Sequence, residues 1–420
     1  MKDMKDIKDM KDAKAMKDMK KDFTEFFLMD SGDACRYAVE VLKFFPAGEE
    51  LESSEIGDGN INYVFRVRSK KSGKSVIIKQ ADRLLRSSGR PLDIYRNKIE
   101  ARVLQIEGEL APGFVPEVYR YDEVMSATSM EDVSDYGNLR KELKENRIYP
   151  HLADSISTFM VDTLLPTTDL VLDRAEKKRR VQFFTNPELC DITEDLVLTE
   201  PYWDYKERNI ITPGNEDFVE EFLYCDEELH ACVAGLRNGF MNNAQALLHG
   251  DLHSGSIFAN EKGIKVLDPE FAFYGPMGYD IGNVIGNLFF SLASKVFTAP
   301  ENDGAIAALE QTVADVFDMT LEKLYDRYEE LVEFPLYLAG GFEDAYIGGI
   351  MADSLGYAGT EIIRRTVGDS KVAELNEVTD PEIKIPLERA LIKLGIFLIK
   401  HRSEISGGNE LVRLFRMIFA

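Results

Sequence analysis

The stretch Leu247–Phe258, LLHGDLHSGSIF, places an Asp between two His residues, then small polar residues, then an apolar segment. Phosphoryl transfer to a hydroxyl needs a carboxylate that orients the hydroxyl and accepts its proton. It also needs metal ions on the phosphates and a cation that holds them. Asp251 is predicted to be that carboxylate. Ser256 lies where a second metal-side ligand is expected, and the Gly residues let the backbone pass close to phosphates.

A second acidic pair lies in VLDPEF, residues 266–271, where Asp268 and Glu270 follow an apolar strand. Residues i and i+2 of an extended segment point the same way. Two hard oxygen ligands on one side suit Mg²⁺ bound to ATP phosphates. Asp-Pro-Glu is also common in simple loops, so the pair alone does not establish a metal site.

Upstream, Lys79 ends the apolar run VIIK, and Glu100 lies in the next predicted helix. A Lys–Glu ion pair in this arrangement would aim the ammonium at phosphates. A short turn that could cover phosphates precedes them, made of Gly57, Asp58, Gly59 and Asn60. Each feature has an ordinary alternative, because strand-ending Lys residues are usually solvated and GDGN is a common turn.

The two His residues of the first motif receive different predictions. His249 is predicted to pack and to fix the loop rather than to catalyse. The role of His253 is left open between structure and chemistry.

The hydrophobic pattern of the rest of the chain predicts an α+β fold. A helix over residues 23–45, a hairpin over 56–80, a helix over 93–107 and two strands over 114–133 are predicted. Helices dominate beyond residue 135, with short strands near 247–275. We therefore predict a small antiparallel-sheet lobe, 23–134, and a larger helical lobe, 135–420. The Met-Lys-Asp repeats of residues 1–22 predict a solvated, disordered tail.

Composition excludes several classes of protein. The 420 residues carry a net charge of −24, which repels phosphate backbones and anionic lipid, so neither nucleic acid nor membrane is a predicted partner. The segment IGNVIGNLFFSLAS, 281–294, is rich in Gly and Asn and predicts a buried core helix rather than a membrane span. Four scattered Cys residues fit a reducing compartment, and we expect a cytoplasmic protein.

Taken together, the motifs resemble the small-molecule kinases with a protein-kinase-like fold, the aminoglycoside phosphotransferase and choline kinase group. Within that group they are similar to the 5-methylthioribose kinases of methionine salvage. The matching stretches are EIGDGNINYVFRV, SMEDVSDY, CDITEDLVLTEPYWD, LLHGDLHSGSIF, KVLDPEFAFYGPMGYDIGNVIGNLF and GTEIIRRTVG. Ser in place of the usual kinase Asn, and Asp-x-Glu in place of Asp-Phe-Gly, are both features of this family.

The resemblance implies an ATP- and Mg²⁺-dependent kinase that phosphorylates O1 of 5-methylthioribose, acting as a homodimer. It implies that Asp251 is the catalytic base, that Asp268 and Glu270 bind Mg²⁺, and that Ser256 supports the phosphate site. Lys79 would contact ATP phosphates and pair with Glu100. The implied adenine hinge consists of Met130, Glu131, Asp132 and Val133, and the implied sugar-site pair consists of Arg364 and Arg365.

One departure from the family and two alternative functions remain. Arg90 stands where the family usually has a Trp near the sugar, which leaves fine substrate preference open. The acceptor could be another small alcohol, such as choline, homoserine or an aminoglycoside. The chain could also be a non-catalytic binding protein on a kinase scaffold. Adjacent Arg residues late in a helix also complement the helix dipole, so Arg364 and Arg365 alone do not distinguish a sugar site from an ordinary helix end.

Overall fold

The computed structural model describes residues 22–56, 62–84 and 93–419, which form two compact units. The N-terminal unit runs to Lys98 and includes Val118–Asp132; the helical unit comprises Ile99–Glu117 and Val133–Ala420. Residues 99–117, predicted with the N-terminal lobe, thus cluster with the helical unit. Residues 1–21 of the predicted tail over 1–22, the GDGN turn over 57–60 and Arg90 lie outside the described residues.

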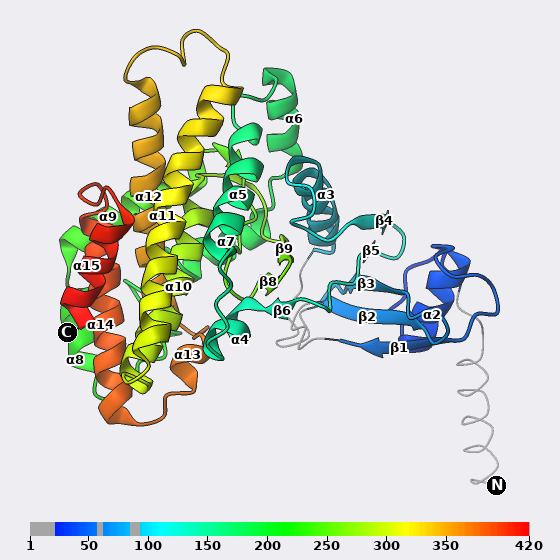
Figure 1. Cartoon of the computed structure of the whole chain (residues 1–420), viewed down its shortest axis with the longest axis horizontal. Helices are drawn as coiled ribbons and strands as arrows, with labels where there is room; N and C mark the ends of the chain where they lie inside the picture. The colour runs from blue at the N-terminus through cyan, green and yellow to red at the C-terminus, as the bar shows by residue number, and fades with distance from the viewer. Residues whose placement is uncertain (1–21, 57–61, 85–92, 420) are drawn as a thin grey trace. The chain divides into compact units, whose positions relative to one another are not determined.

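The N-terminal unit contains a five-stranded antiparallel sheet of order β1-β2-β3-β5-β4 (Figure 1). Its strands are β1 (Leu51–Glu55), β2 (Asn62–Ser69), β3 (Ser75–Ala81), β4 (Val118–Asp122) and β5 (Ala127–Met130). The predicted hairpin is therefore present as β2 and β3, and the two later predicted strands are β4 and β5. Strand β1, LESSE, was not predicted, because its mostly polar and exposed residues give no hydrophobic alternation.

Helix α2 (Ser31–Glu40) covers the apolar core of this unit. Tyr37 is fully buried with Phe65 of β2, and its hydroxyl donates to Asp122 at 2.9 Å. The predicted helix over 23–45 was too long at both ends. It begins only after Asp30, whose side chain accepts from the backbone N–H of Asp33 in a capping box, and it ends before Val41.

The helical unit begins within α3 (Tyr95–Leu110), which matches the predicted helix. The helices that follow are α4 (Leu139–Lys144), α5 (Leu152–Leu164), α6 (Arg174–Phe183), α7 (Pro187–Leu196), α8 (Glu216–Val219), α9 (Glu227–Asn242), α10 (Gly278–Thr298), α11 (Asp303–Leu331), α12 (Phe342–Val367), α13 (Ala373–Asn376), α14 (Pro381–Lys400) and α15 (Gly408–Phe419). A 3₁₀ turn at Leu165–Thr167 follows α5, and a π-helical turn at Glu220–Tyr224 follows α8.

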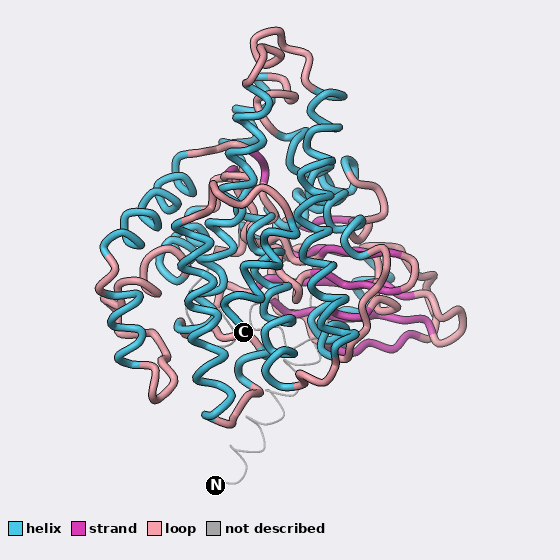
Figure 2. The backbone as a smooth tube through the Cα atoms, turned by 60° about the vertical axis from the view of Figure 1, so that its left-hand side comes forward, coloured by secondary structure: helices cyan, strands magenta, loops and turns pink. Residues whose placement is uncertain are grey.

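Helices α10, α11, α12 and α14 run side by side in Figure 1, and α10 packs on α12, which packs on α14. Figure 2 shows how helices predominate in the fold. Close packing requires glycine here, since a Cβ on Gly282 of α10 would lie 2.4 Å from the carbonyl oxygen of Ser354 on α12. Helix α10 is buried along most of its length, as predicted. Among the described residues, no helix is long and apolar enough to cross a bilayer.

Short strands within this unit carry the motif loops. Strands β6 (Gly137–Asn138), β8 (Ile257–Asn260) and β9 (Gly263–Val266) form one small sheet, and β7 (Ala246–Leu247) pairs with β10 (Tyr274–Gly275). The loop of Asp251 runs from β7 to β8, and the Asp268 segment runs from β9 to β10. These strand pairings fix both ends of both loops.

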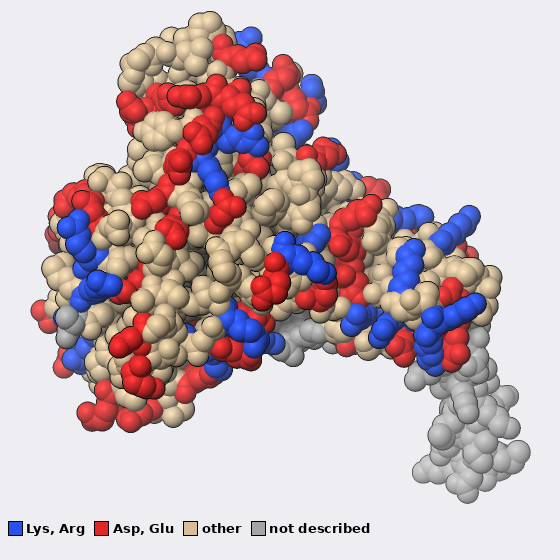
Figure 3. Space-filling view, in the orientation of Figure 1, with Lys and Arg blue, Asp and Glu red and all other residues tan. Residues whose placement is uncertain are grey.

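The surface of the helical unit carries both charge signs. Figure 3 shows Asp and Glu side chains interspersed with Lys and Arg on the visible face. The Asp and Glu residues that give the net charge of −24 are likewise distributed along the sequence.

Candidate active site

The loop that carries Asp251 is anchored by Asp280 in the first turn of α10. The two carboxylate oxygens of Asp280 accept from the backbone N–H groups of His249 at 2.7 Å and Gly250 at 3.0 Å. Burial raises the pKa of Asp280 to about 7, with the hydrogen bonds opposing that rise and the charge of Asp251 adding to it. Gly250 has φ +82°, and a Cβ there would lie 2.3 Å from the carbonyl oxygen of Phe271.

His249 is a structural part of this loop, as predicted. Its Nε2 donates to the carbonyl of Leu267 at 2.9 Å, and its Nδ1 accepts from the backbone N–H of Asp251 at 3.3 Å. The ring is buried, and burial lowers the pKa of His249 to about 4. A neutral imidazole therefore joins the Asp251 loop to the segment that precedes Asp268.

Asp251 lies beside His253, with 3.5 Å between Oδ2 of Asp251 and Nε2 of His253. Ser256 is buried, and its hydroxyl donates to the carbonyl of Asp251 at 2.9 Å. The loop thus closes on itself through the backbone of Asp251 while the carboxylate stays about one-third exposed. A partly open carboxylate on a fixed backbone is suited to accept a proton from a bound hydroxyl.

Asp268 and Glu270 follow β9 in a tight turn, in which the backbone N–H of Glu270 donates to the carbonyl of Asp268 at 2.9 Å. Asp268 is exposed and has φ +65°, a backbone conformation that is uncommon for residues other than Gly. Glu270 is buried. No cluster of three or more His, Cys, Asp or Glu side chains suited to a metal occurs in the described part of the chain.

Arg364 and Arg365 lie in the last turn of α12, where Glu361 holds both. Arg364 Nε donates to Glu361 Oε2, and Arg365 Nε donates to Oε1 at 3.1 Å. Glu361 is fully buried. Burial alone would raise the pKa of Glu361, but the two guanidiniums outweigh it and bring that pKa to about 2. An ionised carboxylate therefore fixes both side chains.

The Arg pair is coupled electrostatically to Asp251. Burial lowers the pKa of Arg365 most and Arg364 lowers it further, whereas the carboxylates of Glu361 and Asp251 raise it. Burial lowers the pKa of Arg364, but Glu361, Tyr279 and Asp251 raise it and prevail. These two cations, 11% and 13% exposed, are thus within electrostatic reach of Asp251, a tertiary proximity that their distance along the chain does not reveal.

A buried polar chain, which the sequence analysis missed, connects these parts. Asn287 of α10 donates to Glu361 Oε1 at 3.1 Å and accepts from Arg140 Nη2 at 2.8 Å. Arg140 Nε in turn donates to Ser254 Oγ at 3.1 Å, inside the Asp251 loop. Glu361 precedes Arg364 by three residues and Arg365 by four, a spacing at which helical side chains are neighbours. Their ion pairs could therefore have been predicted from the sequence. The roles of Asn287 and Arg140 had no sequence signal.

The predicted ATP-site residues are divided between the two units. Lys79 is buried in β3, and Met130 ends β5, which pairs with β3. The predicted hinge crosses from one unit to the other between Asp132 and Val133, and Asp132 Oδ2 accepts from Arg66 Nε at 2.6 Å. Glu100 is buried in α3 and belongs to the helical unit. The Lys79–Glu100 ion pair stays a prediction.

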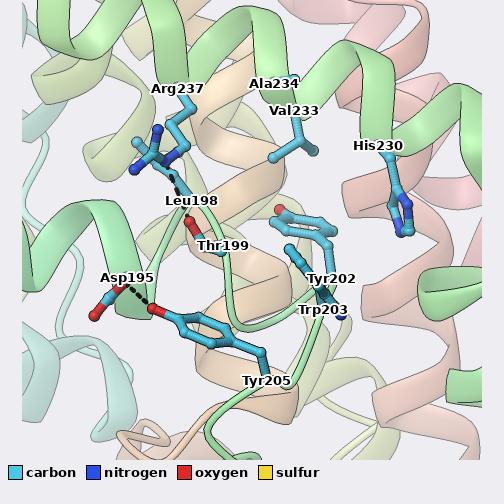
Figure 4. Close-up of a pocket in the computed structure, with 10 residues that line it drawn as sticks. All are labelled: Asp195, Leu198, Thr199, Tyr202, Trp203, Tyr205, His230, Val233, Ala234 and Arg237. Atoms are coloured by element: carbon cyan, nitrogen blue, oxygen red, sulfur yellow. Dashed lines mark hydrogen bonds between the residues drawn. The ribbon is translucent and has the colours of Figure 1, made fainter.

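A separate pocket of about 470 Å³ lies between the α7–α8 connection and α9 (Figure 4). Aromatic side chains of Tyr202, Trp203 and Tyr205 line it, with the Tyr205 hydroxyl donating to Asp195 at 2.7 Å. None of the residues that line it is a predicted site residue, so this pocket is not part of the candidate active site.

Residues 186–324 match the phosphotransferase enzyme family, and the loop around Asp251 fits the chemistry of that class of protein. Methylthioribose kinase from Geobacillus sp. (strain WCH70) is 38% identical over 376 residues, 89% of this chain and 92% of that protein. The Erwinia tasmaniensis methylthioribose kinase is 36% identical over 398 residues, 92% and 97% of the two chains. This chain belongs to the methylthioribose kinase family.

Among solved structures, choline kinase from Cryptosporidium parvum Iowa II is similar with a TM-score of 0.48 and 14% identity, covering 90% of this chain and 98% of that chain. The predicted family, the kinase class and the α+β, protein-kinase-like fold are confirmed.

Proposed function

We propose that this enzyme transfers the γ-phosphoryl group of ATP to O1 of 5-methylthioribose, giving 5-methylthioribose 1-phosphate and ADP in methionine salvage. Membership of the methylthioribose kinase family over about nine-tenths of the chain is the observation that carries the proposal. The fixed loop around Asp251 supports it, because this reaction depends on positioning and electrostatics more than on covalent help from protein.

In this proposal Asp251 is the general base. As O1 attacks the γ-phosphorus, a new O–P bond forms, the bond to the β-phosphate oxygen breaks, and the O1 proton passes to the Asp251 carboxylate. The one-third exposure of that carboxylate leaves room for a substrate hydroxyl. The Asp280 anchor and the Ser256 hydrogen bond hold the backbone, so little reorganisation is needed during transfer.

Asp268 and Glu270 are the proposed Mg²⁺ ligands. Their carboxylates fit the hard oxygen chemistry of Mg²⁺, which usually takes only one or two carboxylates and completes its shell with phosphates and water. The turn around Asp268, with its positive φ, brings the two residues close in the backbone. When bound, Mg²⁺ would neutralise charge on the phosphates.

Further residues complete the proposed ATP site. Lys79 would contact the phosphates and pair with Glu100, and Ser256 would support the phosphate end of the site. The GDGN turn would cover the phosphates, and the stretch from Met130 to Val133 would receive the adenine. The burial of Lys79 and Glu100 supports a paired rather than a solvated role, since buried charges need partners.

Arg364 and Arg365 are the proposed acceptor-site cations. Glu361 fixes both guanidiniums within electrostatic reach of Asp251, which supports a role at the reacting hydroxyl. Guanidinium groups donate hydrogen bonds to sugar hydroxyls and stabilise charge that develops during transfer. They also disfavour a quaternary ammonium acceptor, so choline fits this site less well than a neutral sugar.

The test is ADP release from ATP and Mg²⁺ with a panel of acceptors: methylthioribose, ribose, choline and homoserine. We expect turnover with methylthioribose well above the others, and phosphorus NMR should show a 1-phosphate ester. Preference for choline or homoserine would show that the assigned acceptor is wrong, while the assignment as a kinase would stand. ATP binding without turnover on any acceptor would instead support a non-catalytic binding protein.

We also propose a cytoplasmic homodimer, on the strength of the family resemblance. Sedimentation of the full chain should give twice the mass of one 420-residue chain. A single species at the mass of one chain over the micromolar range would reject the dimer.

A further inference from the structure

His253 lies beside the proposed base, and the proposed function gives it no role. Its Nδ1 accepts from two backbone N–H groups, those of Gly255 at 3.0 Å and Ser256 at 3.1 Å. Its own backbone N–H donates to the carbonyl of Asp251 at 3.0 Å. The ring is therefore held by the same turn that carries Asp251.

These contacts determine where the proton of the ring lies. A nitrogen that accepts two hydrogen bonds carries no proton, so in the neutral imidazole the proton is on Nε2. The Ser256 hydroxyl also lies 3.2 Å from Nδ1, but its single proton is donated to the carbonyl of Asp251. This contact leaves the tautomer unchanged. Nε2, which then carries the proton, lies 3.5 Å from Oδ2 of Asp251.

The surroundings of the His253 ring keep it neutral and leave Asp251 as the neighbour of its Nε2. Burial lowers the pKa of His253, Arg365 and Arg140 lower it further, and Asp251 and Glu361 act in the opposite direction. The 3.5 Å separation is long for a hydrogen bond, as catalytic contacts commonly are before substrates bind. The His253 side chain is 18% exposed and the Asp251 side chain 32%, so the carboxylate is the more open of the two groups.

We propose that His253 is a positioning residue for Asp251, whose Oδ2 it holds through Nε2–H so that Oδ1 faces the acceptor hydroxyl. The backbone N–H groups of Gly255 and Ser256 fix the ring in the tautomer that this contact needs. The inference rests on the proposed function and adds the means by which the base keeps its orientation. The competing explanation is that His253 only caps the turn through Nδ1.

Two substitutions separate these roles. In His253→Asn the amide oxygen reaches the place of Nδ1 and can still cap the turn, but the side chain is too short to reach Asp251. In His253→Gln the amide NH₂ lies near the place of Nε2 and can still donate to Asp251, but the Nδ1 acceptor is lost. The measurements are kcat and KM for both substrates, with thermal unfolding of each variant.

For a positioning role, we expect kcat of His253→Asn to fall about tenfold to 100-fold with the KM for ATP little changed, because a misdirected base costs this much. His253→Gln should recover most of kcat. Wild-type kcat in the Asn variant overturns the proposal. So does a Gln variant impaired as much as the Asn variant, since a donor restored near the place of Nε2 would then recover nothing. A turn cap alone predicts the reverse order, with the Asn variant near wild type and the Gln variant impaired.

A second measurement does not depend on turnover. With ¹⁵N-labelled His in the full chain, we expect an unprotonated Nδ1 and a protonated Nε2 for His253, and an Nε2 signal that shifts in Asp251→Asn. The His253→Asn spectrum assigns the signal among the five His residues. A protonated Nδ1 rejects the proposal. Absence of wild-type turnover on methylthioribose would reject the proposed function instead, while the NMR result for His253 would stand.

Discussion

The carboxylate of Asp280 accepts a hydrogen bond of 2.7 Å from the backbone N–H of His249, joining the start of α10 to the loop of the proposed base. Its other oxygen accepts from Gly250 at 3.0 Å. The position of Asp251 therefore depends on a buried acid that does not contact the reacting atoms in the proposed mechanism.

Asp280→Asn should lower both stability and kcat. Asn offers one acceptor oxygen for two N–H donors, and its NH₂ would face the second donor. Leaving a buried backbone donor unpaired costs about 1–3 kcal/mol. Urea unfolding and steady-state kinetics check this, with the exposed Asp303→Asn as the control. An Asp280→Asn protein with wild-type stability would show that the anchor is dispensable.

Asp251→Asn should leave ATP binding nearly intact and lower kcat about 100- to 10,000-fold, the range for loss of a general base. Calorimetric titration with ATP and turnover on methylthioribose are the measurements. Asp326→Asn, an exposed substitution of the same type on α11, is the matched control. Substantial activity in Asp251→Asn would remove this residue from the role of base.

Asp268→Ala and Glu270→Ala should each raise the Mg²⁺ concentration needed for half-maximal rate, since each removes a hard oxygen ligand. Rates titrated with Mg²⁺ at saturating ATP provide the measurement. Glu261→Ala, in the exposed β8–β9 turn, should behave as wild type. If neither site variant changed its metal dependence, the Asp-x-Glu assignment would be wrong.

Arg364→Ala and Arg365→Ala should lower kcat/KM for methylthioribose on the order of 100-fold, comparable to the loss of a transition-state donor. The KM for ATP should change much less. Because both Arg residues pair with Glu361, unfolding must be measured in parallel. Arg413→Ala, mostly exposed on α15, is the control. Wild-type kinetics in both site variants would reduce the pair to a helix-end feature.

Glu361→Gln should show a pH-dependent loss of stability. The folded-state pKa of about 2 lies below the ordinary value of 4.5, so the carboxylate stabilises the fold above about pH 4.5 and loses this effect as the pH falls toward 2. At pH 7 we expect the variant to be less stable by on the order of 3 kcal/mol, as for a broken buried ion pair.

Unfolding of wild type and Glu361→Gln between pH 7 and pH 3 is the corresponding measurement. The difference should narrow below about pH 4.5, while Glu404→Gln, an exposed partner of His401, should differ little from wild type throughout. A Glu361→Gln difference that stays constant with pH would mean that the carboxylate charge does not contribute.

Local sequence signals correctly predicted helices and strands with strong hydrophobic periodicity. They failed for elements whose formation or bounds depend on tertiary contacts. The β2–β3 hairpin and α3 follow from alternation and helical spacing. The start of α2 was missed, because Asp30 caps a helix that begins only at Ser31, while Phe23 and Phe27 pack on the core ahead of it. Strand β1 forms through pairing with β2, a contact that its polar residues do not signal.

The sequence by itself determined the chemical groups of the candidate site: an Asp in a Gly-bounded loop, an Asp-x-Glu pair after a strand, and two adjacent Arg residues. These are short-range patterns, and their side-chain chemistry is readable without a fold. The tertiary structure alone decided how the groups of the helical unit are held. Asp280 anchors the loop from 30 residues away, and Asn287 lies between Glu361 and Arg140. The physical reason is that buried polar groups must find partners when α10, α12 and the loop pack together, and those partners are set by proximity in space rather than along the chain.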